Sequence, residues 1–150
     1  MIGFMKTIPV FKGLTYDQYK KLLYICYHKT VPADMFVFED DDKSDAMYIL
    51  LQGQLKILYH KSTLITQIDP ISLVGEIGFF TGHQRETSAV TTKESTIIKI
   101  NKPELFRVFH GDCALSNRVL LNVINELSYK LSRYTEIIQD LRIFKDGHVM

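Results

Sequence analysis

The sequence predicts a mainly β domain with flanking helices, followed by one long C-terminal helix. Three observations predict this fold class. Short β-type segments separated by turn residues fill the middle of the chain, amphipathic segments of helical period lie on both sides of them, and a heptad repeat runs through the last part of the sequence. Short strands at such close spacing are typical of an antiparallel sandwich, roll or barrel.

The composition is that of one ordinary globular domain. The chain has 150 residues, of which 46% are hydrophobic and 23% are charged. A chain of this length buries enough surface to fold without disulfides or metals. Its net charge is +1, and its 18 basic and 17 acidic side chains are scattered. This argues against a dedicated nucleic-acid surface, which would gather Lys and Arg and carry an excess of positive charge.

The cysteines and the N-terminus indicate where the protein works. Cys26 and Cys113 lie far apart and form no C-x-x-C or zinc-type spacing, which fits a reducing compartment. We expect both thiols to be core or partly buried. Lys6 and Pro9 come too early for a secretory signal, and no apolar run approaches the length of a membrane span. The protein is therefore expected to be cytoplasmic, with no membrane contact.

The first element is a short amphipathic helix within residues 14–27. Thr15 is a plausible N-cap, Gln18 stands three positions later, and apolar residues continue at helical spacing as far as Cys26. Pro32 then marks a change to β-type patterning. The expected strands occupy 35–38, the two arms of a hairpin within 47–60 that turns at Gln52 and Gly53, 64–68, 87–92 and 95–100.

Two helices are expected after the strands. The first, at 102–110, has Pro103 near its start and Gly111 at its end. The second covers 114–143, and its apolar positions follow steps of four and three that define an uninterrupted heptad seam. The seam consists of Leu120, Ile124, Leu127, Leu131, Tyr134, Ile138 and Leu141.

Isoleucine at one heptad position and mainly leucine at the other favour a parallel two-stranded coiled coil, and hence a homodimer. The alternative is that this helix only packs on its own β body, as many amphipathic helices do. Leu121 and Val123 lie off the seam. They could serve packing on the body while the seam pairs with a second copy.

The segment VGEIGFFTGHQRETSAV, residues 74–90, holds a carboxylate and a guanidinium among glycines. Arg85 offers a planar fork that can bind two phosphate oxygens, and Thr87 can donate a hydroxyl hydrogen. Gly75 and Gly78 allow the backbone to turn with its N–H groups exposed to an anion. Glu76 repels phosphate but could accept hydrogen bonds from sugar hydroxyls. The combination indicates a nucleotide, and the alternative is a turn with an exposed ion pair.

This segment resembles the phosphate-binding cassette of the cyclic nucleotide-binding domain family. Residues 8–23 are similar to the entry helix of that family, 36–58 to its first hairpin, and 95–109 to its last strand and the helix that follows. The long helix is similar to the dimer helix of the catabolite activator protein-like bacterial regulators. The resemblance therefore covers nearly the whole chain, with its motifs in the family's order.

The resemblance implies a double-stranded β-helix, or jelly roll, of eight strands. It divides the chain into a cyclic nucleotide-binding domain at 1–110 and a dimerisation helix at 111–150. The implied function is a regulatory module that binds cAMP or cGMP, without enzymatic activity and without a cofactor. The implied ligand-binding residues are Gly75, Glu76, Ile77, Gly78, Arg85, Glu86, Thr87, Tyr134 and Thr135.

These residues have different implied roles. Arg85 and the backbone N–H groups of 75–78 would hold the cyclic phosphate, and Glu76 the ribose 2′-hydroxyl. Tyr134 and Thr135 match positions that reach the base in the bacterial regulators. Tyr134 also belongs to the heptad seam, which favours packing as its role, and Thr135 could contact the base from either subunit.

The sequence departs from the family pattern in three places. Glu86 replaces a small or hydroxyl residue after the arginine, and Gln84 replaces a proline. If the Glu86 carboxylate pointed inward, about 6 Å from the phosphate, its repulsion would be roughly 3 kcal/mol at an effective dielectric of about 20. If it pointed to solvent, the loss would be small. Asp34 and Asp41 replace glycines, and because aspartate tolerates turn conformations we expect the fold to survive.

Other functions are weighed against this one. A cupin-type metalloenzyme would need two or more histidines on facing strands, whereas the histidines here are dispersed and expected on surfaces or loops: His28, His60, His83, His110 and His148. A structural dimerisation module of the same fold, or a sensor of a different small ligand, remains an alternative. No helix-turn-helix segment follows the long helix, so this chain is not expected to contact nucleic acid directly.

Overall fold

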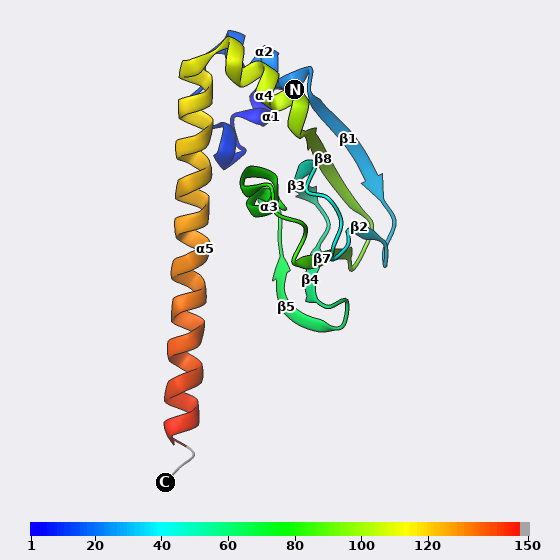
Figure 1. The fold of residues 1–150 in the computed structure, drawn as a ribbon, viewed down its shortest axis with the longest axis vertical. Helices are drawn as coiled ribbons and strands as arrows, with labels where there is room; N and C mark the ends of the chain where they lie inside the picture. The colour runs from blue at the N-terminus through cyan, green and yellow to red at the C-terminus, as the bar shows by residue number, and fades with distance from the viewer. Residues whose placement is uncertain (148–150) are drawn as a thin grey trace.

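The computed structural model describes residues 1–147 and contains two four-stranded antiparallel sheets that face each other (Figure 1). One sheet has the order β1-β8-β3-β6 and the other the order β2-β7-β4-β5. The strands are β1 (Cys26–Val31), β2 (Phe36–Phe38), β3 (Ala46–Gln52), β4 (Leu55–Tyr59), β5 (Thr63–Ile68), β6 (Ser72–Val74), β7 (Thr87–Thr91) and β8 (Ser95–Asn101). The predicted eight-stranded roll is confirmed.

Three helical segments precede the roll: α1 (Ile2–Met5), the single turn η1 (Pro9–Phe11) and α2 (Tyr16–Leu23). Thr15 caps α2 by accepting the Gln18 N–H, and Oε1 of Gln18 accepts the Thr15 N–H, as the sequence predicts. The predicted helix is too long. The observed helix ends at Leu23, and Cys26 already pairs with Ile100 in β8. Pairing along six residues of β8 overrides the helical spacing of this segment.

Residues with positive φ form several turns of the roll. Gly53 closes the β3–β4 turn at φ 97°, and a side chain there would collide with Ser95. Asp34 and Asp41 also have positive φ, at 59° and 68°. Both turns therefore form with aspartate in place of glycine, which confirms the expectation for these two positions.

Apolar side chains form two clusters on opposite sides of the β1-β8-β3-β6 sheet. The smaller cluster lies between the two sheets and includes Phe38, Leu50, Leu55 and Ile97. The larger cluster packs the outer face of that sheet against the helices at both ends of the domain. Its members include Phe11, Leu22, Met47, Ile98, Ile100, Phe79, Leu105, Phe109, Leu115, Val119 and Val123. The helices thus belong to the same fold as the roll.

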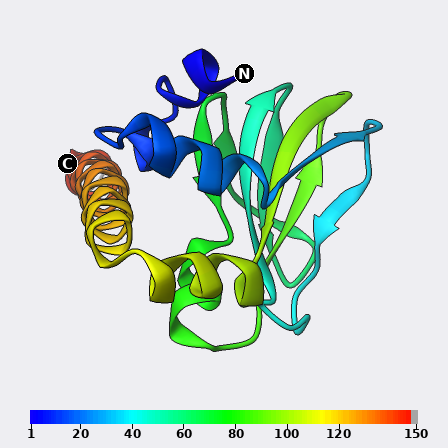
Figure 2. The same ribbon diagram turned by 90° about the horizontal axis from the view of Figure 1, so that it is seen from above.

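The chain leaves the roll through α4 (Lys102–Gly111) and turns into α5 (Cys113–Gly147), as Figure 2 shows from above. The carboxylate of Asp112 accepts the Leu115 N–H at 2.9 Å and so caps α5. Cys26 is half-buried, but Cys113 is exposed, so the expectation for Cys113 is wrong. It lies in the first turn of α5 on the side opposite the buried Leu115.

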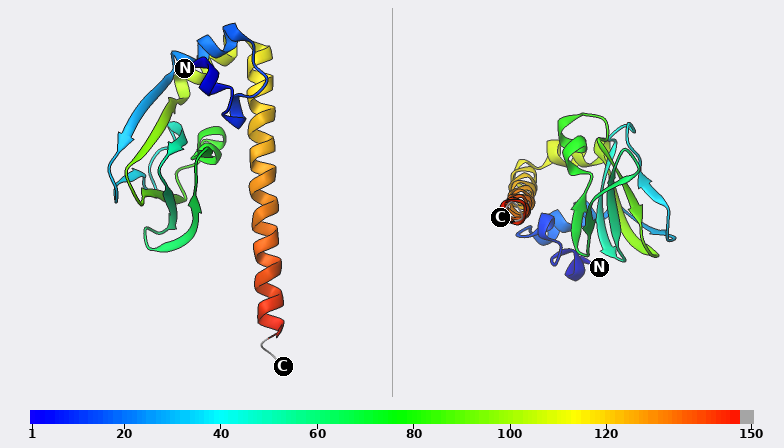
Figure 3. Two further views of the ribbon diagram at one scale, coloured as in Figure 1. Left: turned by 180° about the vertical axis from the view of Figure 1, so that it is seen from behind. Right: turned by 90° about the horizontal axis from the view of Figure 1, so that it is seen from below.

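The apolar contacts between α5 and the domain lie in the first half of the helix. Leu115, Val119 and Val123 are buried and Leu127 packs against the same cluster, whereas Leu121 is exposed and does not serve this contact. The helix then runs past the roll, as both sides of the molecule show (Figures 1 and 3). The seam residues of this part, Leu131, Tyr134, Ile138 and Leu141, are all exposed.

Candidate functional site

The cassette begins where β6 ends. Gly75 has φ 77° and reverses the chain into α3 (Glu76–Thr81), a helix of six residues without a side-chain N-cap. The first N–H groups of any α-helix have no acceptor within the helix. In α3 they have no side-chain acceptor at the N-cap either. A Cβ atom on residue 75 would lie 2.7 Å from Nη1 of Arg85. Glycine at this position allows the arginine to approach the backbone.

Gly78 has a different role from the one predicted. It lies within α3 with no positive φ, so it does not turn the backbone. A Cβ atom there would lie 2.1 Å from Oγ of Ser44 and 3.0 Å from the carbonyl oxygen of His83. Ser44 Oγ itself donates to that carbonyl at 2.7 Å. Gly78 thus lets α3 contact the two loops that flank the cassette.

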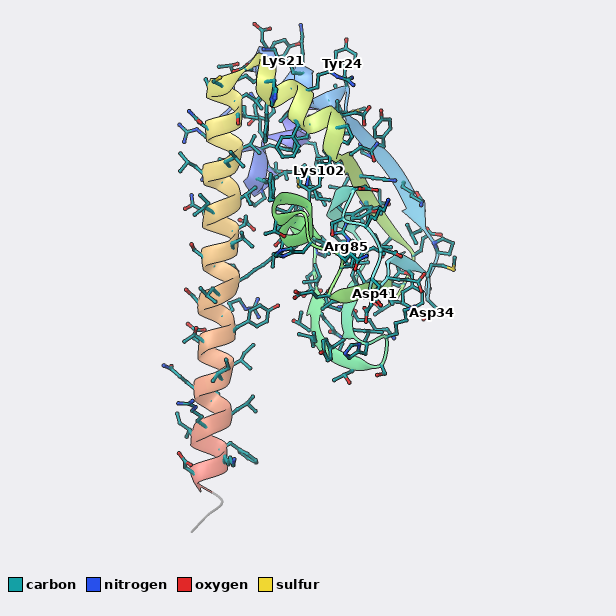
Figure 4. The ribbon with its side chains drawn as sticks, viewed as in Figure 1. Lys21, Tyr24, Asp34, Asp41, Arg85 and Lys102 are labelled. Carbon is teal, nitrogen blue, oxygen red and sulfur yellow. The ribbon has the colours of Figure 1, made fainter. Side chains whose placement is uncertain are left out.

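Arg85 is almost completely inside the protein, with 5% of its surface exposed. Nη1 donates to the carbonyl of Gly75 at 2.6 Å, and Nη2 donates to the carbonyl of Ala46 at the start of β3. The guanidinium also lies over the Phe38 ring, 4.3 Å from its centre. Burial lowers the pKa of Arg85. The arginine therefore joins the cassette to both sheets of the roll, close to Asp41 (Figure 4).

Glu76 is also buried, with 3% of its surface exposed. Its Oε1 accepts a hydrogen bond from Nζ of Lys130, a residue of α5, at 2.7 Å. Lys130 donates at the same distance to the carbonyl of Leu73 in β6. Sequence reasoning missed Lys130 because it followed only the apolar positions of the long helix. The missed signal is that Lys130 lies three residues after Leu127, on the helical face that packs on the domain.

The remaining predicted site residues are more accessible. Ile77 and Glu86 are exposed, and Thr87 is half-buried at the start of β7. Glu86 therefore points to solvent rather than into the domain. Tyr134 is 39% exposed on α5, and the hydroxyl of Thr135 donates to the carbonyl of Leu131 within the same helix. The structure brings Gly75, Glu76 and Arg85 together, whereas Thr135 bonds within its own helix and Tyr134 lies on the exposed seam of α5.

An acidic groove of about 550 Å³ lies at the end of the sheet where β7 begins. It is lined by Asp40, Asp41, Tyr59, His60, His83, Gln84, Arg85 and Glu86. Nδ1 of His60 is 3.9 Å from Oδ2 of Asp40. The lining carries three carboxylates and one arginine, Arg85, so its acidic side chains disfavour a phosphate away from that arginine. Arg85 and Glu86 connect the groove to the cassette, whereas the turn at Gly75 is not on its lining.

Within residues 1–147, no three His, Cys, Asp or Glu side chains are grouped so that they could hold a metal ion. The four histidines of this range are exposed, as expected for surface or loop positions, and His148 lies outside the described residues. None of the described helices combines the length and the apolar character needed to cross a membrane.

Comparison with known proteins places these features in a family. The model of the cyclic nucleotide-binding domain matches residues 28–112, which is more than half of the chain. A cyclic nucleotide-binding domain from Methylobacillus flagellatus KT superposes with a TM-score of 0.81 at 16% identity, covering 93% of this chain and 85% of that one. A protein of Geobacter metallireducens GS-15 named for cyclic nucleotide binding gives 0.77 at 23% identity, covering 86% and 96%.

The catabolite activator protein of Thermus thermophilus has a similar fold as well. Its TM-score is 0.71 at 20% identity, and the match covers 89% of this chain. The same match covers 62% of the Thermus protein, so this chain corresponds to part of that regulator's length. At these identities the three structures establish a shared fold.

Proposed function

The chain belongs to the cyclic nucleotide-binding domain family, and from this premise we propose that it is a regulatory module that binds cAMP or cGMP at its cassette and transmits binding to α5. The observation that carries the proposal is the contact between Arg85 and the Gly75 carbonyl, at 2.6 Å. This contact holds the side chain best suited to a phosphate against the turn that carries Glu76.

The three parts of the cassette suit three parts of a cyclic nucleotide. The guanidinium of Arg85 and the uncapped N–H groups at the start of α3 are donors for the cyclic phosphate. Glu76 is the acceptor for a ribose hydroxyl. Because Glu86 points to solvent, it adds little repulsion, and the departure from the family pattern at this position costs little affinity.

Ligand binding would exchange contacts rather than only add them. Arg85 donates to two carbonyls, and Glu76 is paired with Lys130. A nucleotide that competes for these groups would favour a second arrangement of the cassette and of α5. A ligand shifts such an equilibrium only as far as it prefers one arrangement over the other. This exchange is the proposed route by which binding alters α5.

We further propose that α5 pairs with α5 of a second copy. Leu131, Ile138 and Leu141 are more than half exposed and follow the heptad seam. A strip of large apolar residues at coiled-coil spacing is covered most simply by a parallel twin. The effect of the ligand on α5 would then reach the partner subunit directly. The role requires no catalysis.

Calorimetric titration with cAMP and then cGMP tests the proposal. We expect saturable binding of one nucleotide per protomer by the wild type. Arg85→Lys should bind the nucleotide at least about tenfold more weakly, because lysine retains the charge but cannot form bidentate hydrogen bonds to the phosphate. Arg142→Lys, at an exposed position of α5, is the matched control and should bind like the wild type. An absence of heat from folded wild-type protein would overturn the proposal.

A structural module that dimerises without a nucleotide is the second candidate. It is favoured by one specific observation: both charged groups of the cassette already have partners within the protein. The same titration separates the two candidates, because the structural module would give no heat with either nucleotide. An unchanged dimer in the Arg85→Lys variant would agree with both.

A further inference from the structure

Lys130 of α5 forms two short hydrogen bonds, one to the strand before the cassette and one to the cassette itself. Nζ of Lys130 lies 2.7 Å from Oε1 of Glu76 and 2.7 Å from the carbonyl oxygen of Leu73. One ammonium group thus joins α5 to the last strand before the cassette and to the first residue of α3. We call this contact of Lys130 with Glu76 and Leu73 the α5 latch.

Because both side chains of the latch are largely buried, its loss would cost stability. The side chain of Glu76 is 4% exposed and that of Lys130 is 25% exposed. A carboxylate buried this deeply is costly without a partner, and within residues 1–147 Lys130 is the cation found in ion-pair contact with it. Removal of the ammonium alone would leave the buried charge unpaired. The position of α5 and the state of Glu76 are therefore coupled.

The latch also marks a boundary along α5. Before it, Val119, Val123 and Leu127 pack on the domain, and after it Leu131 is 68% exposed. Lys130 thus extends the attached part of the helix by about one turn beyond the apolar contact. Its contacts are polar and can be exchanged for others, unlike those of the buried apolar residues.

We propose that Lys130 sets the affinity for the nucleotide by competing with the ribose for Glu76, so that ligand binding opens the α5 latch. This inference rests on the proposed function. A ribose hydroxyl that reaches Oε1 of Glu76 must displace the ammonium or share its acceptor. Displacement frees α5 beyond Leu127 from the cassette, and a helix held by the latch correspondingly disfavours the ligand.

Hydrogen exchange of α5 in the absence of nucleotide tests the latch itself. In Lys130→Met we expect the amides of residues 127–141 to exchange faster than in the wild type. Lys145→Met, an exposed lysine near the end of the same helix, is the matched control and should leave this exchange unchanged. Equal exchange in Lys130→Met and the wild type would overturn the proposal.

A second variant separates the latch from general destabilisation. Lys130→Met combined with Glu76→Gln leaves no unpaired buried charge, so the domain should unfold at nearly the wild-type temperature. Faster exchange of 127–141 in this double variant supports the latch. Wild-type exchange in the double variant would attribute the effect in Lys130→Met to the buried charge alone and overturn the proposal.

Nucleotide titration of Lys130→Met tests the competition. Opening the latch in advance should raise the affinity for the nucleotide by about 5- to 150-fold, the usual range of coupling between sites. Unchanged affinity would overturn competition, and weaker binding would make Lys130 a ligand contact instead. If neither protein bound nucleotide, the proposed function would fall and the competition with it. The exchange result would still report separately on whether the contact holds α5.

Discussion

The guanidinium of Arg85 lies over the ring of Phe38, 4.3 Å from its centre, while its two terminal nitrogens donate to the carbonyls of Gly75 and Ala46. The side chain proposed to bind phosphate is thus also a connector inside the fold. It joins the end of β2, the start of β3 and the cassette turn. Ligand binding and stability are therefore expected to depend on the same residue.

Arg85→Met should lower the free energy of unfolding by about 3 kcal/mol, because one buried and one half-buried carbonyl lose their donors. Urea unfolding followed by circular dichroism measures the change. Arg142→Met removes an exposed arginine from α5 and should alter the stability by less than about 0.5 kcal/mol. Equal stability of the two variants would mean that Arg85 does not hold the cassette to the sheets.

Gly78→Ala should destabilise the domain by about 1–3 kcal/mol, because the added methyl group would collide with Ser44 and with the His83 carbonyl. The matched control is Gly111→Ala at the end of α4, where a Cβ atom has no neighbour within 4 Å. Thermal unfolding of both variants compares the two sites. A Gly78→Ala protein as stable as Gly111→Ala would contradict the close approach of α3 to Ser44.

Asp112 is expected to stabilise the start of α5 in a pH-dependent way. The hydrogen bond from Lys21 is the main cause that lowers the pKa of Asp112, and the N–H of Leu115 acts in the same direction. Figure 4 shows Lys21 at this end of α5. Because folding lowers this pKa, the stabilisation is present above the pKa of the unfolded chain. It is lost as the pH falls through the folded value.

The melting temperature of Asp112→Asn measures this effect, since asparagine can still cap the helix but carries no charge. At neutral pH we expect the variant to melt below the wild type. The difference should narrow when the pH falls below about 4. Asp140→Asn, an exposed position of α5, should melt like the wild type throughout. A pH-independent difference for Asp112→Asn would argue against the ionic contribution.

The two thiols should differ in reactivity. Burial raises the pKa of Cys26 to about 12, whereas Cys113 is exposed. Iodoacetamide at mildly alkaline pH should therefore modify Cys113 in the folded protein and leave Cys26 unmodified, while unfolded protein should react at both. Mass spectrometry of the modified peptides provides the measurement. Rapid modification of Cys26 in the folded protein would contradict its burial.

Much of the fold was predictable because local chemistry and the final structure agree. The capping pair of Thr15 and Gln18, the turn at Gly53 and the heptad pattern of α5 are signals carried by a few neighbouring residues. Strands β1 and β6 were missed because distant pairing partners determine them. Cys26 illustrates this, since its spacing fits a helix but its pairing with Ile100 places it in a sheet.

The site was predictable in its residues but not in their contacts. The segment pattern identifies Gly75, Glu76 and Arg85, and the structure brings them to one turn. Their burial and the Lys130 partner depend on how α5 returns along the cassette, 54 residues later in the chain. The spacing from Leu127 places Lys130 on the packed face of α5, but no local pattern identifies Glu76 as its partner. For the same reason the direction of Glu86 could not be predicted from its place beside Arg85.

The most direct test of the central claim is a map of backbone amide resonances during titration with cAMP and, separately, cGMP. The account predicts that the largest shifts fall on residues 75–78 and 85–87, with smaller shifts along α5 near Lys130. Groove residues outside the cassette, such as Asp40, Tyr59 and His60, should change little. A folded protein whose spectrum stays unchanged with both nucleotides, or shifts centred on Asp40, Tyr59 and His60, would contradict the assignment of the cassette as a cyclic nucleotide site.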